Sequence, residues 1–433
     1  MDWADKFSGG GFPTQRAMIR AAISNPEHPY YPFIHRLVTD IDPHVMKTLV
    51  ANFFINANLA GWKKQDECRE KYGCNIPWAI LLDPTSACNL HCTGCWAAEY
   101  GNKLNLTYDE IDDIIRQGKE LGVYMYIYTG GEPLVRKKDL IRLCEKHNDC
   151  IFLSFTNATL IDEDFANDML RVGNFVPAIS LEGFETATDG RRGNGVYQKV
   201  IKAINLLREK KLVFGISACY TSANFESITS EAFYDSLIDL GAYFIWYFHY
   251  MPVGNDAAPD LLPTKEQREY MYHRVREIRG ATGGKPIYAM DFQNDGEFVG
   301  GCIAGGRNYC HINANGDVEP CVFIHYSSAN IREVTLLEAL KQPLFMAYRD
   351  RQPFNSNHLR PCPMLENPEI LQEMIKETGA KSTDLQSPES AEHLCSKCKA
   401  YACEWKKTAD QLWKEHPHQQ KGYTNYKKRV EKQ

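Results

Sequence analysis

Hydrophobic and polar positions divide the chain into three regions. In the first, residues 1–75, apolar side chains recur at helical spacing and the alternation typical of a strand is missing. The clearest case is residues 44–61, where the apolar positions at that spacing are Met46, Leu49, Val50, Phe53 and Phe54. We expect a helix packed on the main domain. A helix lying on a membrane surface is the alternative, although its polar face lacks a cluster of Lys and Arg.

The second region, residues 76–283, alternates between strand-like and helix-like segments. The strand-like runs are residues 78–82, 124–128, 151–155, 175–180, 212–219 and 243–250. Helical patterns follow them, the first opening with a capping box of Thr107 and Glu110. Six alternations predict an α/β fold with a parallel sheet, a partial, TIM-like (β/α)6 barrel two units short of a full one. Ligands of such a sheet bind at the carboxyl ends of its strands.

The third region, residues 284–433, is irregular. The last helix predicted in the second region begins at Thr264, where Gln267 completes a second capping box. The regular alternation of strands and helices is lost soon after this helix. From about residue 285 the chain is rich in Gly, Asn, Pro and Cys. Residues 381–390 are typical of a polar connecting loop, and the basic tail, residues 421–433, is expected to fray. We therefore expect a separate cysteine-rich C-terminal domain.

Composition narrows the class of protein. The 433 residues are 44% hydrophobic and 24% charged, typical of a globular enzyme, and the formal net charge is −6. A nucleic-acid partner is not expected, since that class favours a basic domain. No run approaches the length of a membrane-spanning helix, and the first residues lack the positive start of a signal peptide. We expect a cytoplasmic protein.

The chain has fifteen cysteines, many for a reducing compartment, and most of them are clustered. Clustered cysteines in such a compartment indicate metal-binding or catalytic sites rather than disulfides. The clustered residues are Cys88, Cys92 and Cys95, then Cys302, Cys310, Cys321 and Cys362, then Cys395, Cys398 and Cys403. The scattered ones are expected to be small buried hydrophobic residues, namely Cys68, Cys74, Cys144, Cys150 and Cys219.

The first cluster has the spacing C-x3-C-x2-C and directly follows the first predicted strand. Thiolates are the ligands of iron–sulfur clusters, which normally take four cysteines. Three closely spaced cysteines can hold three irons of a cubane and leave the fourth iron open for chemistry. Zinc is the alternative, but three ligands on one loop would leave a structural zinc short of its fourth.

This motif, at the end of the first of six β/α units, resembles that of the radical S-adenosylmethionine (SAM) enzymes. A second match follows the second predicted strand, where the sequence is Thr129, Gly130, Gly131, Glu132 and Pro133. It resembles the family's GGEP motif, which binds the amine of the methionine moiety. The resemblance implies that SAM chelates the open iron and is cleaved reductively to a 5′-deoxyadenosyl radical that abstracts hydrogen. It also implies a low-potential reductant such as flavodoxin or ferredoxin.

Looser matches follow the third and fourth predicted strands. Asn157, Ser180, Glu182 and Arg192 resemble the family's contacts to the ribose and carboxylate of SAM. One departure concerns the residue just before the third cysteine, where many members have an aromatic side chain near the adenine. That position is Gly94 here, and Trp96 follows the cysteine instead.

The second cluster resembles the opening of the SPASM-type extension, which binds auxiliary [4Fe–4S] clusters. Thirteen residues separate Cys302 from Gly316, and four more separate Gly316 from Cys321. Asn315-Gly316 predicts a hairpin that brings Cys310 and Cys321 together. Cys362 is the expected fourth ligand.

The third cluster, Cys395-x2-Cys398-x4-Cys403, resembles the later part of this extension with one residue too few, and no cysteine follows Cys403. Three arrangements stay open. A second auxiliary cluster has three cysteines with an outside ligand or an open iron, or Cys362 is not a ligand and one cluster draws on both cysteine groups, or the third group binds zinc. We therefore expect one or two auxiliary clusters.

The resemblance implies an oxidoreductase acting on an organic substrate, with a peptide or protein side chain as the leading hypothesis. Radical modification of a lipid chain is one alternative. An iron–sulfur electron carrier or scaffold without SAM chemistry is another. Candidate acids and bases lie near the predicted sites, but none is assigned as the general base: Glu99, Tyr100, Asp291, Asp295, Glu297, His311 and Glu319.

Overall fold

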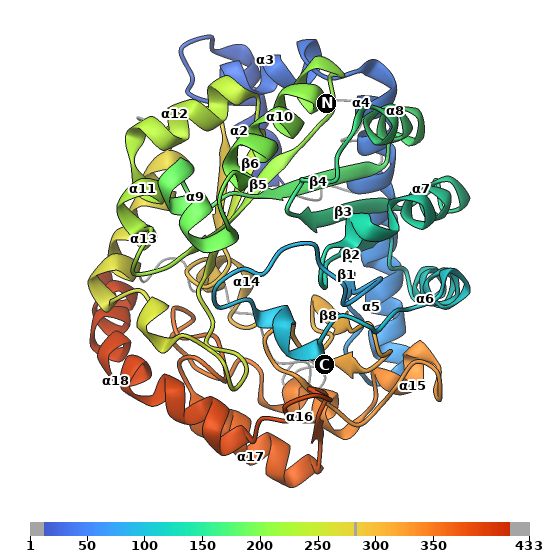
Figure 1. The fold of residues 1–433 in the computed structure, drawn as a ribbon, viewed down its shortest axis with the longest axis vertical. Coiled ribbons are helices and arrows are strands. Elements are labelled where there is room, and N and C mark those ends of the chain that lie inside the picture. Colours follow the sequence, from blue (N-terminus) through green and yellow to red (C-terminus); the bar gives the residue numbers. More distant parts are fainter. Residues whose placement is uncertain (1–12, 281–283, 416–433) are drawn as a thin grey trace.

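A single nine-stranded sheet runs through the computed structural model, which describes residues 13–280 and 284–415 (Figure 1). Its first six strands are parallel and follow chain order: β1 (Ala79–Leu82), β2 (Met125–Tyr128), β3 (Ile151–Thr156), β4 (Phe175–Ser180), β5 (Gly215–Tyr220) and β6 (Phe244–His249). The strands are mostly buried on both faces, which explains their continuous apolar runs. The predicted six-unit α/β core is confirmed.

Helices connect these strands on the outside of the sheet (Figure 1). They are α6 (Tyr108–Glu120), α7 (Lys137–Lys146), α8 (Glu163–Val172), α9 (Glu185–Arg192), α10 (Val196–Glu209), α11 (Phe225–Thr229), α12 (Glu231–Leu240) and α13 (Lys265–Ile278). Both predicted capping boxes are present, at the first residues of α6 and α13. The buried apolar face of α6 carries Ile111, Ile114 and Ile115.

The sheet extends beyond the six predicted units. β7 (Tyr288–Asp291) pairs with β6, and β8 (Tyr309–Ile312) pairs with the free edge of β1, both in parallel. The two-residue β9 (Val318–Glu319) is antiparallel to β8. At the two ends of the parallel set, the rings of Phe292 and Tyr309 meet edge to face with centroids 6.0 Å apart. Residues beyond the predicted core therefore complete the barrel-like sheet.

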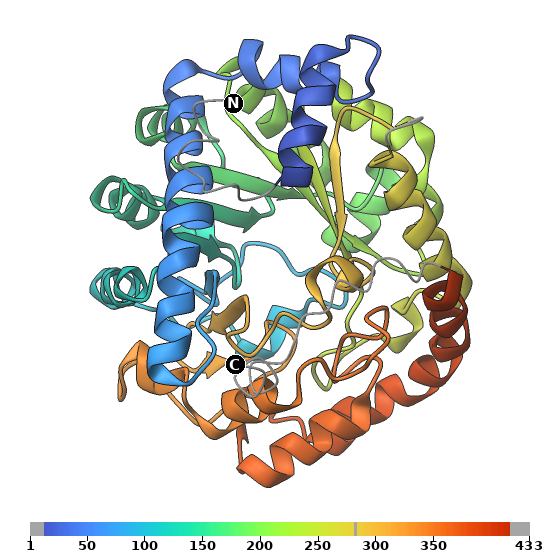
Figure 2. The same cartoon turned by 180° about the vertical axis from the view of Figure 1, so that it is seen from behind.

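The N-terminal segment is helical, as predicted. α2 (Pro13–Ser24) and α3 (Tyr31–Thr39) precede one long helical run made of α4 (Pro43–Leu49), a wider π-type segment (Val50–Ala60) and α5 (Gly61–Tyr72). Figure 2 shows this run as a long blue helix beside the strands. Asn52 anchors it by donating to the carbonyls of Asn148 and Cys150, each at 2.8 Å.

The outer side of this run exposes a row of apolar side chains: Val50, Phe54, Ile55, Leu59 and Trp62. Neither this run nor any other helix in the described ranges is long and apolar enough to cross a membrane. The membrane-surface alternative and the cytoplasmic location stay predictions. The N-terminal and C-terminal tails considered above lie outside the described residues.

The C-terminal part wraps the lower end of the barrel in Figure 1. It contains α14 (Gly296–Val299), β10 (Tyr326–Ser327), α15 (Leu336–Ala339), α16 (Pro343–Arg351), α17 (Pro368–Thr378), β11 (Lys381–Ser382) and α18 (Ala391–Glu415). β10 and β11 form a separate small antiparallel pair. The third cysteine group therefore lies on one 25-residue helix, α18, and not in irregular chain.

Candidate functional site

A cavity of about 220 Å3 lies inside the barrel and opens at the carboxyl ends of the strands. All three cysteines of the first cluster line it, together with the loop after β2. Aromatic side chains form much of its lining and include Phe155, Trp246, Phe248, Phe292 and Tyr309. The cysteine motif and the Thr129–Pro133 motif, which are 34 or more residues apart in the sequence, thus line the same cavity.

Hydrogen-bond donors lie next to the cysteine sulfurs in the loop after β1. The N–H of Leu90 donates to Cys88 Sγ at 3.4 Å, and Arg192 Nη1 lies 3.9 Å from Cys92 Sγ. Burial raises the pKa of the Cys88 thiol to about 11, and the charges of Cys92 and Cys95 act in the same direction. Mutual repulsion of this kind is relieved when a metal centre binds the thiolates.

No three Cys, His, Asp or Glu side chains in the described part of the chain are placed to hold a single metal ion. The three cysteines line one cavity. Three thiols around one cavity suit a cubane, because each binds a different iron of the cluster. The donor set therefore fits an iron–sulfur cluster better than a lone zinc.

The loop after β2 packs its backbone directly on the cysteine loop. Glu132 N donates to the carbonyl of Ala87 at 2.8 Å, and Gly131 N donates to that of Thr85 at 3.1 Å. A Cβ added at Gly131 would lie 2.3 Å from Ala87 O. Gly130 has a φ of +102°, which disfavours other residues. Both glycines are needed for this close approach.

Replacing Gly131 with Ala should therefore displace one loop from the other by about 1 Å. A shift of that size can cost about a hundredfold in rate, and we expect that loss in 5′-deoxyadenosine formation. Gly190→Ala is the matched control, because a Cβ at Gly190 meets nothing within 4 Å. Equal nucleoside yields from the two variants, measured with SAM and dithionite, would contradict the steric argument.

Glu132 is buried and its carboxylate is held by the chain itself. It accepts from Thr156 Oγ1 at 2.6 Å, from Asn157 N at 2.7 Å and from Leu134 N at 3.0 Å. Asn157 Nδ2 in turn donates to Asn89 Oδ1 on the cysteine loop at 2.9 Å. Glu132 and Asn157 thus tie the ends of β2 and β3 to the cysteine loop. The side chain of Glu132 fixes the loop, and its contact with a SAM amine stays a prediction.

Glu182 and Arg192, both predicted site residues, form a buried ion pair. Arg192 Nε donates to Glu182 Oε1 at 3.0 Å. Arg191, which the sequence motifs did not indicate, also donates to this oxygen through its Nη1, at 2.8 Å. Arg191 also joins the cysteine loop, since its carbonyl accepts from Thr93 N at 3.0 Å and its Nε donates to Thr93 O at 3.3 Å. Ser180, Arg191 and Arg192 line the cavity.

Tyr250 occupies the space next to Gly94, where the family pattern has an aromatic residue. A Cβ at Gly94 would lie 2.7 Å from the Tyr250 ring, and Gly94 has a φ of +65°. Tyr250 follows β6, lines the cavity and accepts a hydrogen bond from Ala258 N at 2.9 Å. The missing bulk before Cys95 is therefore matched by an aromatic ring from another strand.

Tyr348 on α16 lies within electrostatic range of four further cysteines, the second group of thiols. Burial raises the pKa of Tyr348 well above its usual value, and the charges of Cys302, Cys321, Cys362 and Cys395 add to the rise. The Tyr348 hydroxyl is buried and makes no hydrogen bond to the described chain. A buried donor without a partner, within electrostatic range of several thiols, fits a bound group that carries acceptors, as the sulfides of an iron–sulfur cluster do.

Three of these sulfurs already accept backbone hydrogen bonds. Cys302 receives one from Ala304, Cys321 from Phe323, and Cys362 from Met364 at 3.4 Å. Such donors stabilise thiolates. The set draws on both C-terminal cysteine groups, as one of the alternatives from the sequence did, but it includes Cys362, which that alternative left out.

Cys310 lies in β8, and its predicted role as a ligand together with Cys321 stays a prediction. Side chains alternate along β8, and its neighbour Tyr309 lines the cavity. Cys310 therefore faces the opposite side, where it is fully buried and acts on the pKa of Tyr126. On α18, Cys398 is buried, whereas Cys403 is exposed because five residues turn a helix by about 140° beyond a full turn.

Iron content should separate these cysteines. We expect Cys321→Ala to lose about four irons per chain and Cys310→Ala to lose none. The second change removes only a small buried side chain and should cost about 1 kcal/mol of stability. Iron loss from both variants after anaerobic reconstitution would show that Cys310 is a ligand after all.

The candidate acids and bases near the second group are engaged elsewhere. Burial raises the pKa of Asp291 to about 6, Asp295 pairs with Arg279, and Glu297 pairs with Arg276. His311 lies between Asp83 and Glu319 at 2.9 and 2.7 Å. Tyr100 donates to Glu319 at 2.8 Å. None of these residues lines the cavity, and the side chain of Glu99 lies outside the described set. No general base is assigned.

Comparisons with known proteins agree with this geometry. Residues 82–226 match the radical SAM superfamily, and residues 302–363 match SPASM, an iron–sulfur cluster-binding domain. An "AdoMet-dependent heme synthase" of Methanosarcina barkeri is 26% identical over 60% of this chain and 80% of its own. A "PqqA peptide cyclase" of Bradyrhizobium diazoefficiens is 26% identical over 60% of this chain and 70% of its own.

Solved structures support the fold. SuiB of Streptococcus suis bound to S-adenosylmethionine has a TM-score of 0.59 at 21% identity, covering 78% of this chain and 81% of that one. The two family matches, over residues 82–226 and 302–363, show that the chain belongs to the radical SAM superfamily and carries a SPASM-type C-terminal extension. It is an enzyme, and its motifs imply [4Fe–4S] clusters and SAM.

Proposed function

We propose that the protein cleaves SAM reductively at a [4Fe–4S] cluster held by Cys88, Cys92 and Cys95, and abstracts hydrogen from an apolar part of an organic substrate. The observation that supports this proposal is the shared cavity. It joins the three thiols and the Thr129–Pro133 loop to an aromatic interior. When bound, the cluster and SAM supply the 5′-deoxyadenosyl radical, and the protein supplies position and shelter.

The residues around the cavity have separable tasks. Glu132 fixes the spacing between the β2 loop and the cysteine loop. Arg191 and Arg192 bring positive charge to the sulfurs, and Glu182 holds both arginines in place. The aromatic walls exclude water, which would quench a reactive intermediate.

A peptide or protein side chain is the proposed substrate. Among the described residues of the cavity wall, the acidic and basic side chains are Glu132, Arg191 and Arg192. Both arginines are paired with Glu182. This wall favours an uncharged, apolar group over a polyanion. Relatives named for peptide chemistry, the PqqA peptide cyclases and SuiB bound to precursor peptide SuiA, support the choice.

A lipid chain is the second candidate, because the same aromatic wall fits a hydrocarbon. Hydrogen transfer distinguishes the two. Cells grown in deuterated medium supply a peptide-and-protein fraction and a lipid extract, and each is incubated with enzyme, unlabelled SAM and dithionite. Deuterium in 5′-deoxyadenosine from the peptide fraction, read by mass spectrometry, supports the proposal. Deuterium from the lipid extract alone would replace it with the second candidate.

We further propose one auxiliary [4Fe–4S] cluster on Cys302, Cys321, Cys362 and Cys395, and a low-potential flavodoxin or ferredoxin as reductant. Four thiols complete the coordination of a cubane and leave no open iron. An electron carrier without SAM chemistry would load the same iron and form no 5′-deoxyadenosine. About eight irons per chain together with nucleoside formation is the expected result.

A further inference from the structure

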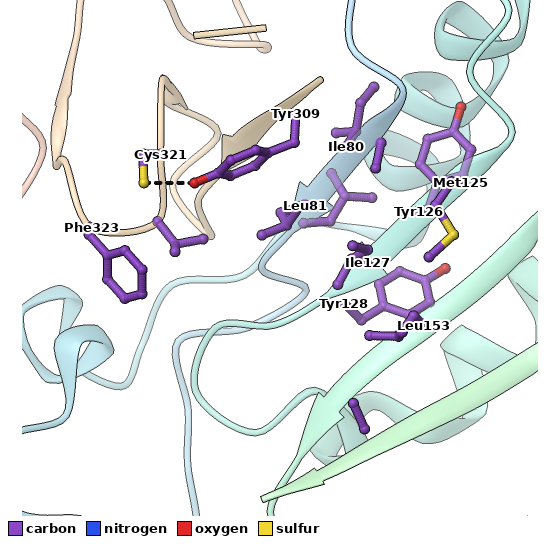
Figure 3. Close-up of a cluster of buried hydrophobic side chains, with 14 of the residues drawn as sticks. Ile80, Leu81, Met125, Tyr126, Ile127, Tyr128, Leu153, Tyr309, Cys321 and Phe323 are labelled. Atoms are coloured by element: carbon purple, nitrogen blue, oxygen red, sulfur yellow. Dashed lines mark hydrogen bonds between the residues drawn. The ribbon is translucent and has the colours of Figure 1, made fainter. Parts of the chain in front are cut away.

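Tyr309 joins the cavity to the second group of thiols. It begins β8, and its register partner on β1 is Ala79, which also lines the cavity. The Tyr309 hydroxyl donates to Cys321 Sγ at 2.7 Å (Figure 3). Figure 3 shows the ring reaching from β8 across to the sulfur, with Phe323 and Leu81 nearby. One side chain therefore touches both the cavity and a thiol of the second group.

This contact is dry. Tyr309 is 5% exposed and Cys321 is 7% exposed. A hydrogen bond in such surroundings is electrostatically stronger than one in water, because few solvent dipoles screen it. The hydroxyl has one proton, and the structure directs it at the sulfur.

The chemical effect of a hydrogen bond on a cluster thiolate has a known sign. Reduction adds negative charge to the cluster and its ligands, and a donor aimed at a ligand sulfur stabilises the reduced form. Donors in the shell around the ligands tune metal centres in this way. Removing the donor should therefore make the cluster harder to reduce.

We propose that Tyr309 sets the reduction potential of the auxiliary cluster through its hydrogen bond to Cys321. Tyr309 is a positioning residue in this proposal, since it acts through a ligand. The inference rests on the proposed auxiliary cluster at this cysteine group. It also gives the cavity a direct link to that cluster, because a substrate packed on the Tyr309 ring is one side chain away from Cys321.

The test uses full-length protein in which Cys88, Cys92 and Cys95 are all alanine, so that only auxiliary iron remains. Tyr309→Phe is made in this background, because it removes the hydroxyl and keeps the ring. The midpoint potential, from a redox titration followed by electron paramagnetic resonance, should move to more negative values. Tyr128→Phe is the matched control, since the Tyr128 hydroxyl is also buried but makes no hydrogen bond to the described chain. The cysteines that act on the pKa of Tyr128 are Cys144 and Cys150, which belong to no proposed cluster.

A second variant guards against a folding defect. Incorporation of 3-fluorotyrosine at position 309 keeps the shape and makes the hydroxyl a stronger donor, so the potential should move to more positive values. If both Tyr309 variants bind iron and keep the midpoint potential of the background protein, the inference is overturned, whereas the proposed auxiliary cluster still stands. Absence of iron in the background protein would overturn the auxiliary cluster, and this inference with it.

Discussion

Replacing Cys88, Cys92 and Cys95 together with alanine should lower bound iron from about eight to about four per chain. It should also abolish 5′-deoxyadenosine formation. The physical reason is that these three cysteines line the cavity beside the Thr129–Pro133 loop. Among the described residues of the cavity wall, Cys219 is then the one cysteine left, and a single thiol cannot replace three. Iron analysis and chromatography of the nucleoside measure both losses in one anaerobic preparation.

A control for this experiment changes cysteines of no proposed cluster. Cys144 and Cys150 are fully buried among the helices and strands of the first half of the barrel. Their replacement by alanine should cost some stability but leave iron and nucleoside yield unchanged. Nucleoside formation by the triple variant of the cysteine loop would refute the assignment of the SAM-binding cluster.

Glu366→Ala should produce the largest loss of stability. Glu366 Oε1 lies 2.7 Å from Arg268 Nη1, and both side chains are 0% exposed. Removing the carboxylate leaves a guanidinium buried without its counter-ion, which typically costs about 3–5 kcal/mol. Arg268 also connects α13 to the Tyr401 hydroxyl on α18, at 3.3 Å. The midpoint of urea unfolding should fall accordingly.

Two further variants separate charge from packing. Arg268→Met combined with Glu366→Leu removes both charges and keeps volume, so most of the lost stability should return. Glu377→Ala breaks the exposed pair with Arg351 and should change the midpoint little. A double variant as unstable as Glu366→Ala would show that Glu366 acts through its hydrogen bond from Cys362 N, at 2.7 Å, and not through charge.

The sequence was informative where the signal is local. Apolar runs of four to six residues, punctuated by helices with capping boxes, predicted the six core strands correctly. The cysteine loop and the Gly130–Gly131 turn were located because each directly follows a strand, and parallel strands bring their ends together. Arg191 was missed, although it adjoins Arg192, because only the folded structure shows that both arginines reach Glu182.

Longer-range features were not predictable. β7 and β8 have four residues each, too few for a clear alternation. Brief alternation at residues 311–313 indicated a strand near β8, but its partner β1 is so distant in sequence that no local pattern assigns it to the main sheet. Two signals were present but unused. Alternation along residues 309–312 places Cys310 opposite Tyr309. Helical spacing of Leu394, Cys398, Tyr401, Trp405 and Leu412 predicts a helix that leaves Cys403 outside.

The pairing of β1 with β8 has a consequence for how the chain folds. Ala79 meets Tyr309 across 230 residues of sequence, so one edge of β1 has no partner until most of the chain has left the ribosome. Contacts this distant form late, and an open strand edge attracts other chains in the meantime. A chain cut after residue 283 would keep that edge exposed and should aggregate. The C-terminal extension therefore finishes the folding of the very barrel that it follows.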